Sequence, residues 1–214
     1  MLEKPAPLDC SYSDIFRMRL STNLGSFQRL NTEAVDLKRA AVGIVLVQLA
    51  GSDETAFLLT LRASTLRSHG GQYALPGGRC DLEETAIEAA LREIEEELGM
   101  GLTPDDVMGV LDDYPTRSGY VITPVVFWGG VSPVIVPNPD EVAEIFRIGL
   151  RQITHDDAVR FITIEQSDRP VVQLLINEDY IHAPTAAILY QFREVLLGRT
   201  VRVHALEQPV FAWR

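Results

Sequence analysis

The chain has 214 residues, of which 46% are hydrophobic and 23% are charged, with 15 Gly and 12 Pro. This composition excludes a disordered and a fibrous protein, and the length suits one globular domain that buries roughly 70% of its unfolded surface. Nineteen Lys and Arg against thirty Asp and Glu give a net charge of −11. The charge argues against a protein whose affinity comes from neutralising nucleic-acid or membrane phosphates.

Neither a membrane span nor an export signal is predicted. The longest apolar runs fall short of the ~20 residues that a membrane helix needs. The first residues include Glu3, Asp9 and Asp14 and lack the apolar core of a secretory signal. We therefore expect a cytoplasmic protein. Cys10 and Cys80 are the only cysteines, and their number and spacing predict two reduced thiols rather than a disulfide framework or a zinc site.

The first elements are predicted as an extension followed by a hairpin. Residues 1–38 are polar and mixed, and we expect them to form an N-terminal extension packed on the body, with a short helix around 13–19. The segment AAVGIVLVQLA at 40–50 predicts a buried strand. The residues GSDE at 51–54 predict the turn into a second strand at 56–62.

A Gly-rich loop at 69–79 leads into the strongest predicted helix, Leu82–Leu98. Asp81 is expected to cap this helix, with Glu84 at its third position, and Gly99 to end it. Four strands and a closing helix follow, at 107–112, 120–128, 160–165, 171–176 and 184–197. Because helices and strands mix without strict βαβ alternation, we predict an α+β fold with a mixed sheet.

The predicted helix carries several acidic residues near its C-terminus, where negative charge is unfavourable. Its core-facing stripe consists of Ile87, Leu91, Ile94 and Leu98, whereas Glu93, Glu96 and Glu97 share another face. Carboxylates at this spacing repel each other by a few tenths of a kcal/mol per pair. Negative charge in the last turn also opposes the helix dipole, at about 0.3–1 kcal/mol per group. A cation is expected to offset this cost.

Two kinds of cation are available. Arg92 can pair with Glu88 and with Glu96, but Glu93 and Glu97 have no partner at helical spacing. A divalent metal is the other candidate, since Mg²⁺ binds through one or two carboxylates together with substrate phosphates. The alternative is a solvated acidic face.

The spacing of these residues matches a known signature. Reading from Gly78, five residues precede Glu84, and seven more precede the sequence Arg92-Glu93-Ile94-Glu95-Glu96-Glu97-Leu98-Gly99-Met100. Over these 23 residues the chain resembles the Nudix hydrolases at every position of their signature. The resemblance implies an α+β fold of the Nudix type, an α/β/α sandwich around a central mixed sheet. It would place a Nudix domain at 39–200 and a C-terminal tail at 201–214.

The resemblance also implies a reaction: hydrolysis of a nucleoside diphosphate linked to another moiety, with Mg²⁺ or Mn²⁺. The implied metal ligands are Glu93, Glu96, Glu97 and the carbonyl of Gly77. Arg92 and Glu84 would orient the carboxylates. The two adjacent glycines fit this reading because a backbone without Cβ can approach a metal closely.

The general base has two candidates. Glu93 lies in the signature helix itself. Glu141, with Glu144 behind it, lies in PNPDEVAEIF at 137–146, which we predict to be a loop entering a short helix.

The interval 55–80 gives information about the substrate, because it contains no acidic residue. Its basic residues are Arg62, Arg67, His69 and Arg79. In an acidic chain this interval predicts an anion-facing surface, and arginine suits phosphate through its planar fork. His69 is either a phosphate contact or a loop residue.

Within this interval, LLTLRASTLRSHGGQYALPGG at 58–78 resembles a second signature, that of the coenzyme A diphosphatase branch of the Nudix family. Two departures stand out: Leu75 where the branch has Phe, and His182-Ala183 where it usually shows Trp-Gly. The branch would yield adenosine 3′,5′-bisphosphate and 4′-phosphopantetheine. Arg62 and Arg67 are the first candidates for contact with the 3′-phosphate of coenzyme A.

Two other functions compete with this one. The chain is either a Nudix hydrolase of ADP-ribose or another nucleoside diphosphate derivative, or a non-catalytic nucleotide-binding scaffold. The intact set of carboxylates argues against the scaffold. The partner expected in each case is a small nucleotide derivative rather than nucleic acid or a membrane, and the sequence leaves a homodimer open.

Overall fold

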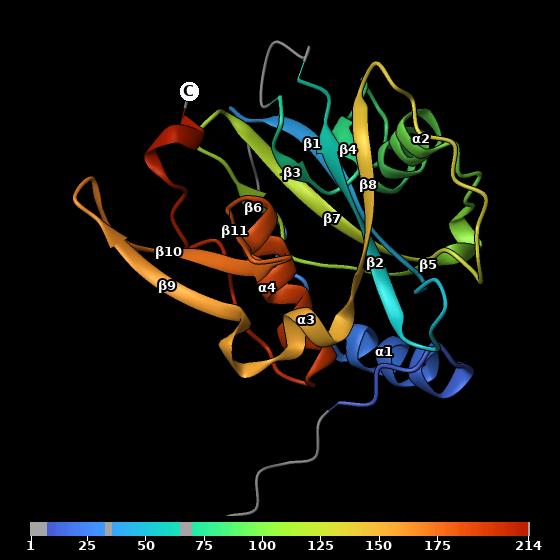
Figure 1. Ribbon diagram of the computed structural model, residues 1–214. Helices are drawn as coiled ribbons and strands as arrows, with labels where there is room; N and C mark the ends of the chain where they lie inside the picture. Colours follow the sequence, from blue (N-terminus) through green and yellow to red (C-terminus); the bar gives the residue numbers. More distant parts are fainter. Residues whose placement is uncertain (1–7, 33–35, 65–69, 214) are drawn as a thin grey trace, which may run out of the picture.

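A computed structural model describes residues 8–32, 36–64 and 70–213 (Figure 1). The helices are α1 (Asp14–Ser26), α2 (Ala86–Leu98), α3 (Leu150–Thr154) and α4 (Thr185–Leu196), with 3-10 turns at η1 (Pro104–Asp106), η2 (Asp156–Ala158) and η3 (Val210–Trp213). The strands are β1 (Lys38–Gln48), β2 (Thr55–Arg62), β3 (Tyr73–Ala74), β4 (Gly77–Arg79), β5 (Val107–Val110), β6 (Tyr114–Pro115), β7 (Tyr120–Trp128), β8 (Val142–Gly149), β9 (Val159–Ile164), β10 (Ser167–Ile176) and β11 (Asp179–His182).

The central sheet is mixed, as predicted. Its main path runs β3-β2-β1-β7-β5, and β4, β6 and β8 pair with β1, β7 and β2 respectively. Strands β1 and β7 are parallel, from Lys38 opposite Tyr120 to Leu46 opposite Trp128, and the other pairs are antiparallel. A smaller antiparallel sheet has the order β11-β10-β9. The α+β class with a mixed central sheet is thereby confirmed.

The central sheet splits at one end. Strands β1 and β2 pair only from Leu46–Gln48 to Thr55–Phe57. Farther along, β4 pairs with β1 and β3 pairs with β2, so the chain between β3 and β4 lies where the two strands diverge. This divergence brings the glycine-rich segment to the face that carries α2.

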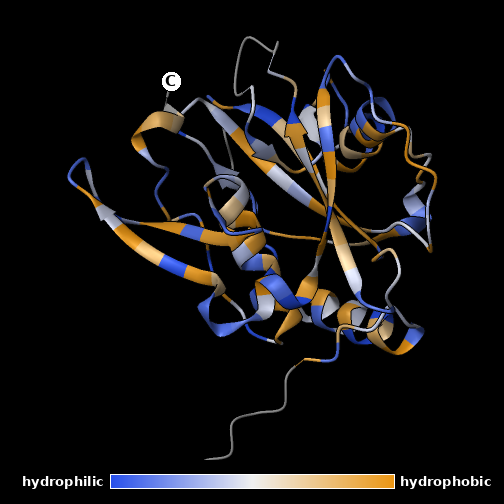
Figure 2. Cartoon of the chain, viewed as in Figure 1, coloured by the Kyte–Doolittle hydropathy of each residue, from blue (hydrophilic) through white to orange (hydrophobic). Residues whose placement is uncertain are grey.

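Alternating residues of β1 face two separate cores. Ala41, Val45 and Val47 belong to the core beneath α2. Ile44 and Leu46 face the opposite core, to which α1, α3, α4 and the small sheet contribute. The result is a layered structure with α2 on one face and the other helices on the other (Figure 1). Apolar residues follow the central strands, whereas the turn between β9 and β10 is polar (Figure 2).

Helix α2 packs closely on the sheet. A Cβ atom at Gly43 of β1 would lie 2.6 Å from Cδ1 of Ile94, so the absence of a side chain there sets the helix position. Ile94 and Leu98 are fully buried, and Ile87 and Leu91 pack against the same core. The predicted stripe therefore faces the sheet.

Several sequence expectations were wrong in detail. Residues 142–149 form a strand, β8, rather than entering a short helix, because antiparallel pairing along β2 covers an edge that would otherwise be open. Their apolar spacing suits a helix, but Val142, Ile145, Phe146 and Ile148 are β-branched or aromatic and suit a strand. The first helix is longer than predicted, and the short β3, β4, β6, β11 and α3 were not predicted.

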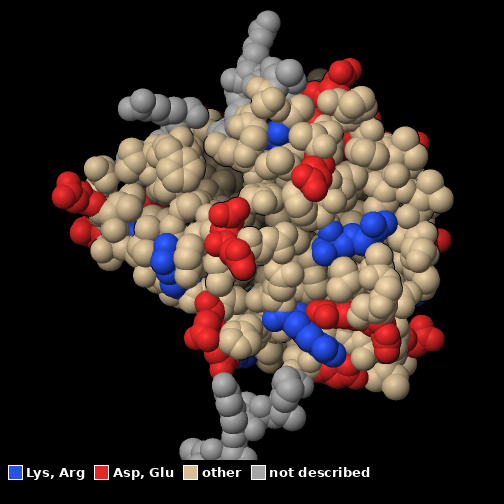
Figure 3. Space-filling model, viewed as in Figure 1, with Lys and Arg blue, Asp and Glu red and all other residues tan. Residues whose placement is uncertain are grey.

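Three further features concern the cysteines, the helix lengths and the surface charge. Cys10 and Cys80 are both free thiols. Within the described ranges, the helices are all too short or too polar to cross a bilayer. On the face seen in Figure 3, Lys and Arg side chains form small separate patches and no continuous basic surface.

Candidate active site

The acidic helix begins four residues later than predicted. Thr85 is its N-cap and forms a capping box with Glu88, and Gly99 ends it in the left-handed conformation at φ 64°. Glu83, at φ 67°, interrupts the helical path before Thr85. The carboxylate of Glu84 accepts a hydrogen bond from the Asp81 backbone at 2.7 Å. The sequence thus holds two overlapping capping patterns, and the second one starts the helix.

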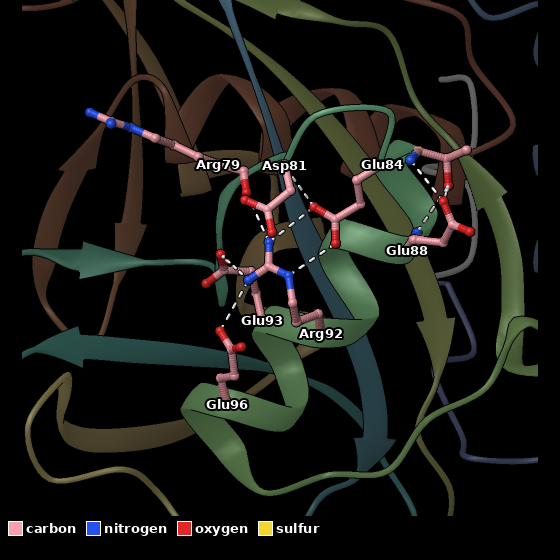
Figure 4. A network of polar contacts seen from close by, with 8 residues as sticks. Arg79, Asp81, Glu84, Glu88, Arg92, Glu93 and Glu96 are labelled. Atoms are coloured by element: carbon pink, nitrogen blue, oxygen red, sulfur yellow. Dashed lines mark hydrogen bonds and ion pairs between the residues drawn. The ribbon is translucent and has the colours of Figure 1, made fainter.

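Arg92 is the centre of a network of acidic residues (Figure 4). Its guanidinium donates to Glu84 Oε1 at 2.9 Å and Oε2 at 3.1 Å, to Glu93 Oε1 at 2.9 Å and to Glu96 Oε2 at 3.0 Å. A fifth bond goes to the carbonyl of Arg79 at 2.9 Å. All five bonds fix the orientation of Glu93 and Glu96 relative to the loop.

The expected pair of Arg92 with Glu88 does not form. Glu88 instead accepts hydrogen bonds from the backbone and hydroxyl of Thr85, at 2.8 and 2.7 Å. Arg92 reaches the neighbouring Glu93, which spacing along one helix face did not predict.

Glu97 is buried against the glycine loop. Glu97 is only 2% exposed, and its Oε2 accepts a hydrogen bond from the Gly77 N–H at 3.2 Å. Arg62 Nη1 lies 3.6 Å from its Oε1. The pKa of Glu97 is raised to about 7, chiefly by burial and also by the charges of Glu93 and Glu141, while Arg62 and the Gly77 N–H oppose the shift.

Glu93 lies directly behind Gly78. A Cβ atom at Gly78 would lie 2.3 Å from Glu93 Oε1, so only glycine leaves this carboxylate in place. Burial also raises the pKa of Glu93, although Arg92 lowers it. Two crowded carboxylates, Glu93 and Glu97, therefore sit beneath two consecutive glycines.

Glu141 approaches the same carboxylates from the loop before β8. The Asn138 N–H donates to the Glu97 carbonyl at 3.0 Å, and the Glu141 carbonyl accepts from the Ala63 N–H at 2.8 Å. Its side chain accepts from Asn138 Nδ2 at 3.4 Å. Because the charge of Glu141 raises the pKa of both Glu93 and Glu97, it lies within electrostatic reach of them.

Glu144 lies on the other face of the sheet. It pairs with Leu61 in the β2–β8 register, next to Arg62, whose side chain contacts Glu97. Neighbouring residues of a strand point to opposite faces. Glu144 therefore points away from the carboxylates of α2.

The carboxylates do not converge as a complete metal centre. Over the part of the chain that is described, no three His, Cys, Asp or Glu side chains are grouped to hold one ion. Glu93 and Glu96 turn toward Arg92 instead, and Glu97 turns toward Gly77. The donor chemistry still suits a hard divalent cation, because every group is an oxygen ligand and two of them are crowded anions with raised pKa values.

The predicted substrate-binding residues divide into three groups. Arg62 is paired with Glu97 on the α2 face. Arg79 is exposed, at the end of β4. Arg67 and His69 lie outside the described residues. Of the departures from the coenzyme A branch, Leu75 is buried in the larger core, and His182 stacks edge-on against Phe211.

Sequence reasoning named Arg62 as a substrate contact but did not foresee its pairing with Glu97. It missed two other residues near the site. Asn138 was overlooked, although an Asn next to Pro before Glu141 is typical of a turn that fixes a following carboxylate. Tyr120 gave no signal, because only the parallel β1–β7 register brings it beside Lys38 and Arg79.

Comparison with known proteins places this geometry in context. Residues 37–175 match the NUDIX domain. The chain is 38% identical over 131 residues to a protein of Escherichia coli (strain K12) named as an uncharacterized Nudix hydrolase, NudL. The match covers 59% of this chain and 65% of that protein, slightly less than two thirds of its length.

Solved structures of Nudix proteins resemble the chain to different degrees. A MutT/nudix family protein from Enterococcus faecalis superposes with a TM-score of 0.50 at 17% identity, covering 76% of this chain and 62% of that one. A Nudix hydrolase from M. Smegmatis, RenU, is 28% identical with a TM-score of 0.44, covering 54% of this chain and 73% of that one. The first of these shows the fold alone.

Proposed function

The chain belongs to the NUDIX family, and from this premise we propose that it is a divalent-metal-dependent diphosphatase acting on coenzyme A or its derivatives. Water attacks one phosphorus of the diphosphate, and the bridging P–O bond breaks. The products are adenosine 3′,5′-bisphosphate and 4′-phosphopantetheine.

The observation that carries the proposal is the close contact of two consecutive glycines with two carboxylates, of which Glu97 is buried and Glu93 half-buried. Gly77 donates its N–H to Glu97, and Gly78 leaves just enough room for Glu93. Two neighbouring carboxylates that are wholly or partly removed from water destabilise the fold unless a cation compensates their charge. The same arrangement leaves a backbone without side chains beside the oxygen ligands, where a diphosphate has to approach.

Each residue then has a role. Glu93, Glu96 and Glu97 would hold the metal, with the Gly77 carbonyl as a further ligand. Mg²⁺ or Mn²⁺, when bound, neutralises the diphosphate charge and lowers the pKa of bound water. Arg92 orients Glu93 and Glu96, and Glu84 positions Arg92 by its two contacts.

The general base is assigned to Glu141. Glu93 is fixed by Arg92 and pressed against Gly78, which suits a ligand. Glu141 is only partly buried and belongs to a separate loop, within electrostatic reach of Glu93 and Glu97. A base in this place can take the proton from the attacking water without giving up a metal contact. Glu93 remains the alternative base.

The choice of coenzyme A rests on the sequence of residues 58–78. This segment runs through the end of β2, β3 and the glycine pair, all at the split end of the sheet. A Nudix hydrolase of ADP-ribose is the second candidate, favoured by the departures at Leu75 and His182. We place the activity in the cytoplasm, as the sequence predicts.

A panel of diphosphates separates these candidates. The wild type is incubated with coenzyme A, 3′-dephospho-coenzyme A, ADP-ribose or NADH, with Mg²⁺ or Mn²⁺, and the phosphate-containing products are identified. The proposal expects the highest kcat/KM for coenzyme A. Faster cleavage of ADP-ribose would support the second candidate, and no cleavage at all would support a non-catalytic scaffold.

A further inference from the structure

A second polar cluster lies at the split end of the sheet, on the face opposite α2. Lys38 is the first residue of β1, Arg79 the last of β4 and Tyr120 the first of β7. Lys38 pairs with Tyr120, and Arg79 pairs with Ala40, two residues after Lys38. Residues at alternate positions of a strand share a face, so all three side chains lie on the same side of the sheet.

Both cations contact one aromatic ring. The Lys38 Nζ lies 5.8 Å, and the Arg79 Cζ 5.2 Å, from the centre of the Tyr120 ring. Among the described residues, no carboxylate comes within 4.0 Å of the charged group of either side chain. In a protein of net charge −11, two exposed cations on one ring, neither paired with a carboxylate of the described residues, form a local positive site.

This cluster adjoins the carboxylates of α2 through the backbone. Gly78 and Arg79 are consecutive, with Cα atoms about 3.8 Å apart, and they face opposite sides of the strand. The Gly78 side meets Glu93, and the Arg79 carbonyl accepts from Arg92. Figure 4 shows the Arg79 guanidinium directed away from α2. Because three strands begin or end here, one ligand can contact both faces around the strand ends.

We propose that Lys38, Arg79 and Tyr120 form a phosphate subsite that binds a phosphate monoester on the ribose of the substrate. The inference rests on the proposed function, since it takes the diphosphate to lie at Glu93 and Glu97. Arg62 does not fill this role, because its side chain pairs with Glu97 on the face that carries α2, away from this cluster. A guanidinium and an ammonium on one ring offer several N–H donors to three phosphate oxygens, and the ring limits where the guanidinium can lie.

Product binding tests the subsite without turnover. The dissociation constants of adenosine 3′,5′-bisphosphate, adenosine 2′,5′-bisphosphate and adenosine 5′-monophosphate are measured by calorimetry, without divalent metal. We expect one bisphosphate to bind the wild type at least about tenfold more tightly than the monophosphate. Arg79→Gln and Lys38→Gln should each remove most of this preference. The bisphosphate that binds better identifies the position of the monoester.

Arg17→Gln is a matched control. Arg17 is also exposed and lies over an aromatic ring, with its Cζ 5.6 Å from the Trp128 centroid. Trp128 is at the opposite end of the β1–β7 pair from Tyr120, about 26 Å away at 3.3 Å per residue. This variant should keep the wild-type preference. Arg79→Lys should keep part of it, which separates loss of charge from loss of structure.

Two results would overturn the subsite: equal affinity of the wild type for all three nucleotides, or retention of the preference in the double variant Lys38→Gln/Arg79→Gln. A kinetic comparison distinguishes failure of the subsite proposal from failure of the proposed diphosphatase function. If the wild type hydrolyses coenzyme A and 3′-dephospho-coenzyme A equally, the subsite is wrong and the diphosphatase stands. If it hydrolyses neither but binds a bisphosphate preferentially, the proposed reaction is wrong and the subsite stands.

Discussion

A Cβ atom placed on Gly78 would lie 2.3 Å from Oε1 of Glu93. Real side chains do not approach so closely, and the Glu93 carboxylate is also held by Arg92 at 2.9 Å. Glu93 is therefore fixed on one side by an arginine and on the other by the absence of a side chain.

Replacing Gly78 with alanine should displace the Glu93 carboxylate. Because the clashing atoms are the end of a flexible side chain, the stability cost should be small, below about 1 kcal/mol. A displacement of about 1 Å in a catalytic group can cost about 10²-fold in rate, so kcat/KM should fall by that order. Gly101→Ala is the control, since a Cβ there has no neighbour within 4 Å. Full activity in Gly78→Ala would mean that Glu93 has no positional role.

Replacing Glu97 with glutamine should abolish turnover and raise the stability of the metal-free protein above neutral pH. The pKa of Glu97 is raised to about 7 in the folded state, from 4.5, so its ionisation destabilises the fold as pH rises from about 4.5 to 7. At pH 8 the glutamine variant should be more stable by up to about 3 kcal/mol, and below pH 4 the difference should vanish. Denaturant unfolding at several pH values measures this.

The same variant tests metal binding. Added Mg²⁺ or Mn²⁺ should raise the Tm of the wild type, since a ligand of the folded state stabilises it, and the shift should shrink in Glu97→Gln. Glu95→Gln, an exposed position on the same helix, should behave as wild type. Loss of stability in Glu97→Gln with activity retained would make Glu97 a structural residue.

Glu141→Gln should lower kcat by about 10²–10⁴-fold if Glu141 takes the proton from water. The metal-induced Tm shift should stay the same, because the residue is assigned to the base and not to the metal. Glu144→Gln, three residues away on the opposite face of the sheet, should have little effect. A decrease of less than tenfold in Glu141→Gln would move the assignment to Glu93.

The C-terminal segment should make stability sensitive to acid. Glu207 is 1% exposed, and its pKa is lowered to about 2, chiefly by hydrogen bonds from Arg117. A lowered pKa stabilises the fold above the unfolded value of 4.5, and this contribution is lost as pH falls from 4.5 toward 2. Between these values the wild type should lose about 1–3 kcal/mol more than Glu207→Gln. Parallel acid unfolding curves for the two proteins would contradict this.

The sequence predicted those parts of the fold that depend on local patterns. Gly99 ends α2 because a left-handed residue is needed there, and the 3.6-residue period identified the buried stripe that includes Ile94. The predicted start of α2 was wrong, because Asp81 and Thr85 each precede a Glu by three residues and Thr85 is the N-cap. Only the backbone at Glu83, in the left-handed region, decides between them.

The sequence predicted the site as a set of residues, but it could not predict how their side chains are arranged. Spacing along one helix identified Glu93, Glu96 and Glu97, because these share a face. It could not show that Arg62 contacts Glu97, or that Tyr120 lies beside Arg79, since both contacts depend on pairing between strands far apart in sequence. Strand β8 was missed for the same reason: its partner β2 lies about eighty residues earlier in the chain.

The most direct test of the proposed function is product analysis of coenzyme A incubated with the wild type and with Glu97→Gln in the presence of Mg²⁺ or Mn²⁺. The account predicts equal amounts of adenosine 3′,5′-bisphosphate and 4′-phosphopantetheine from the wild type, only with metal, and none from the variant. Intact coenzyme A after incubation with the wild type, or the same products from Glu97→Gln, would contradict it.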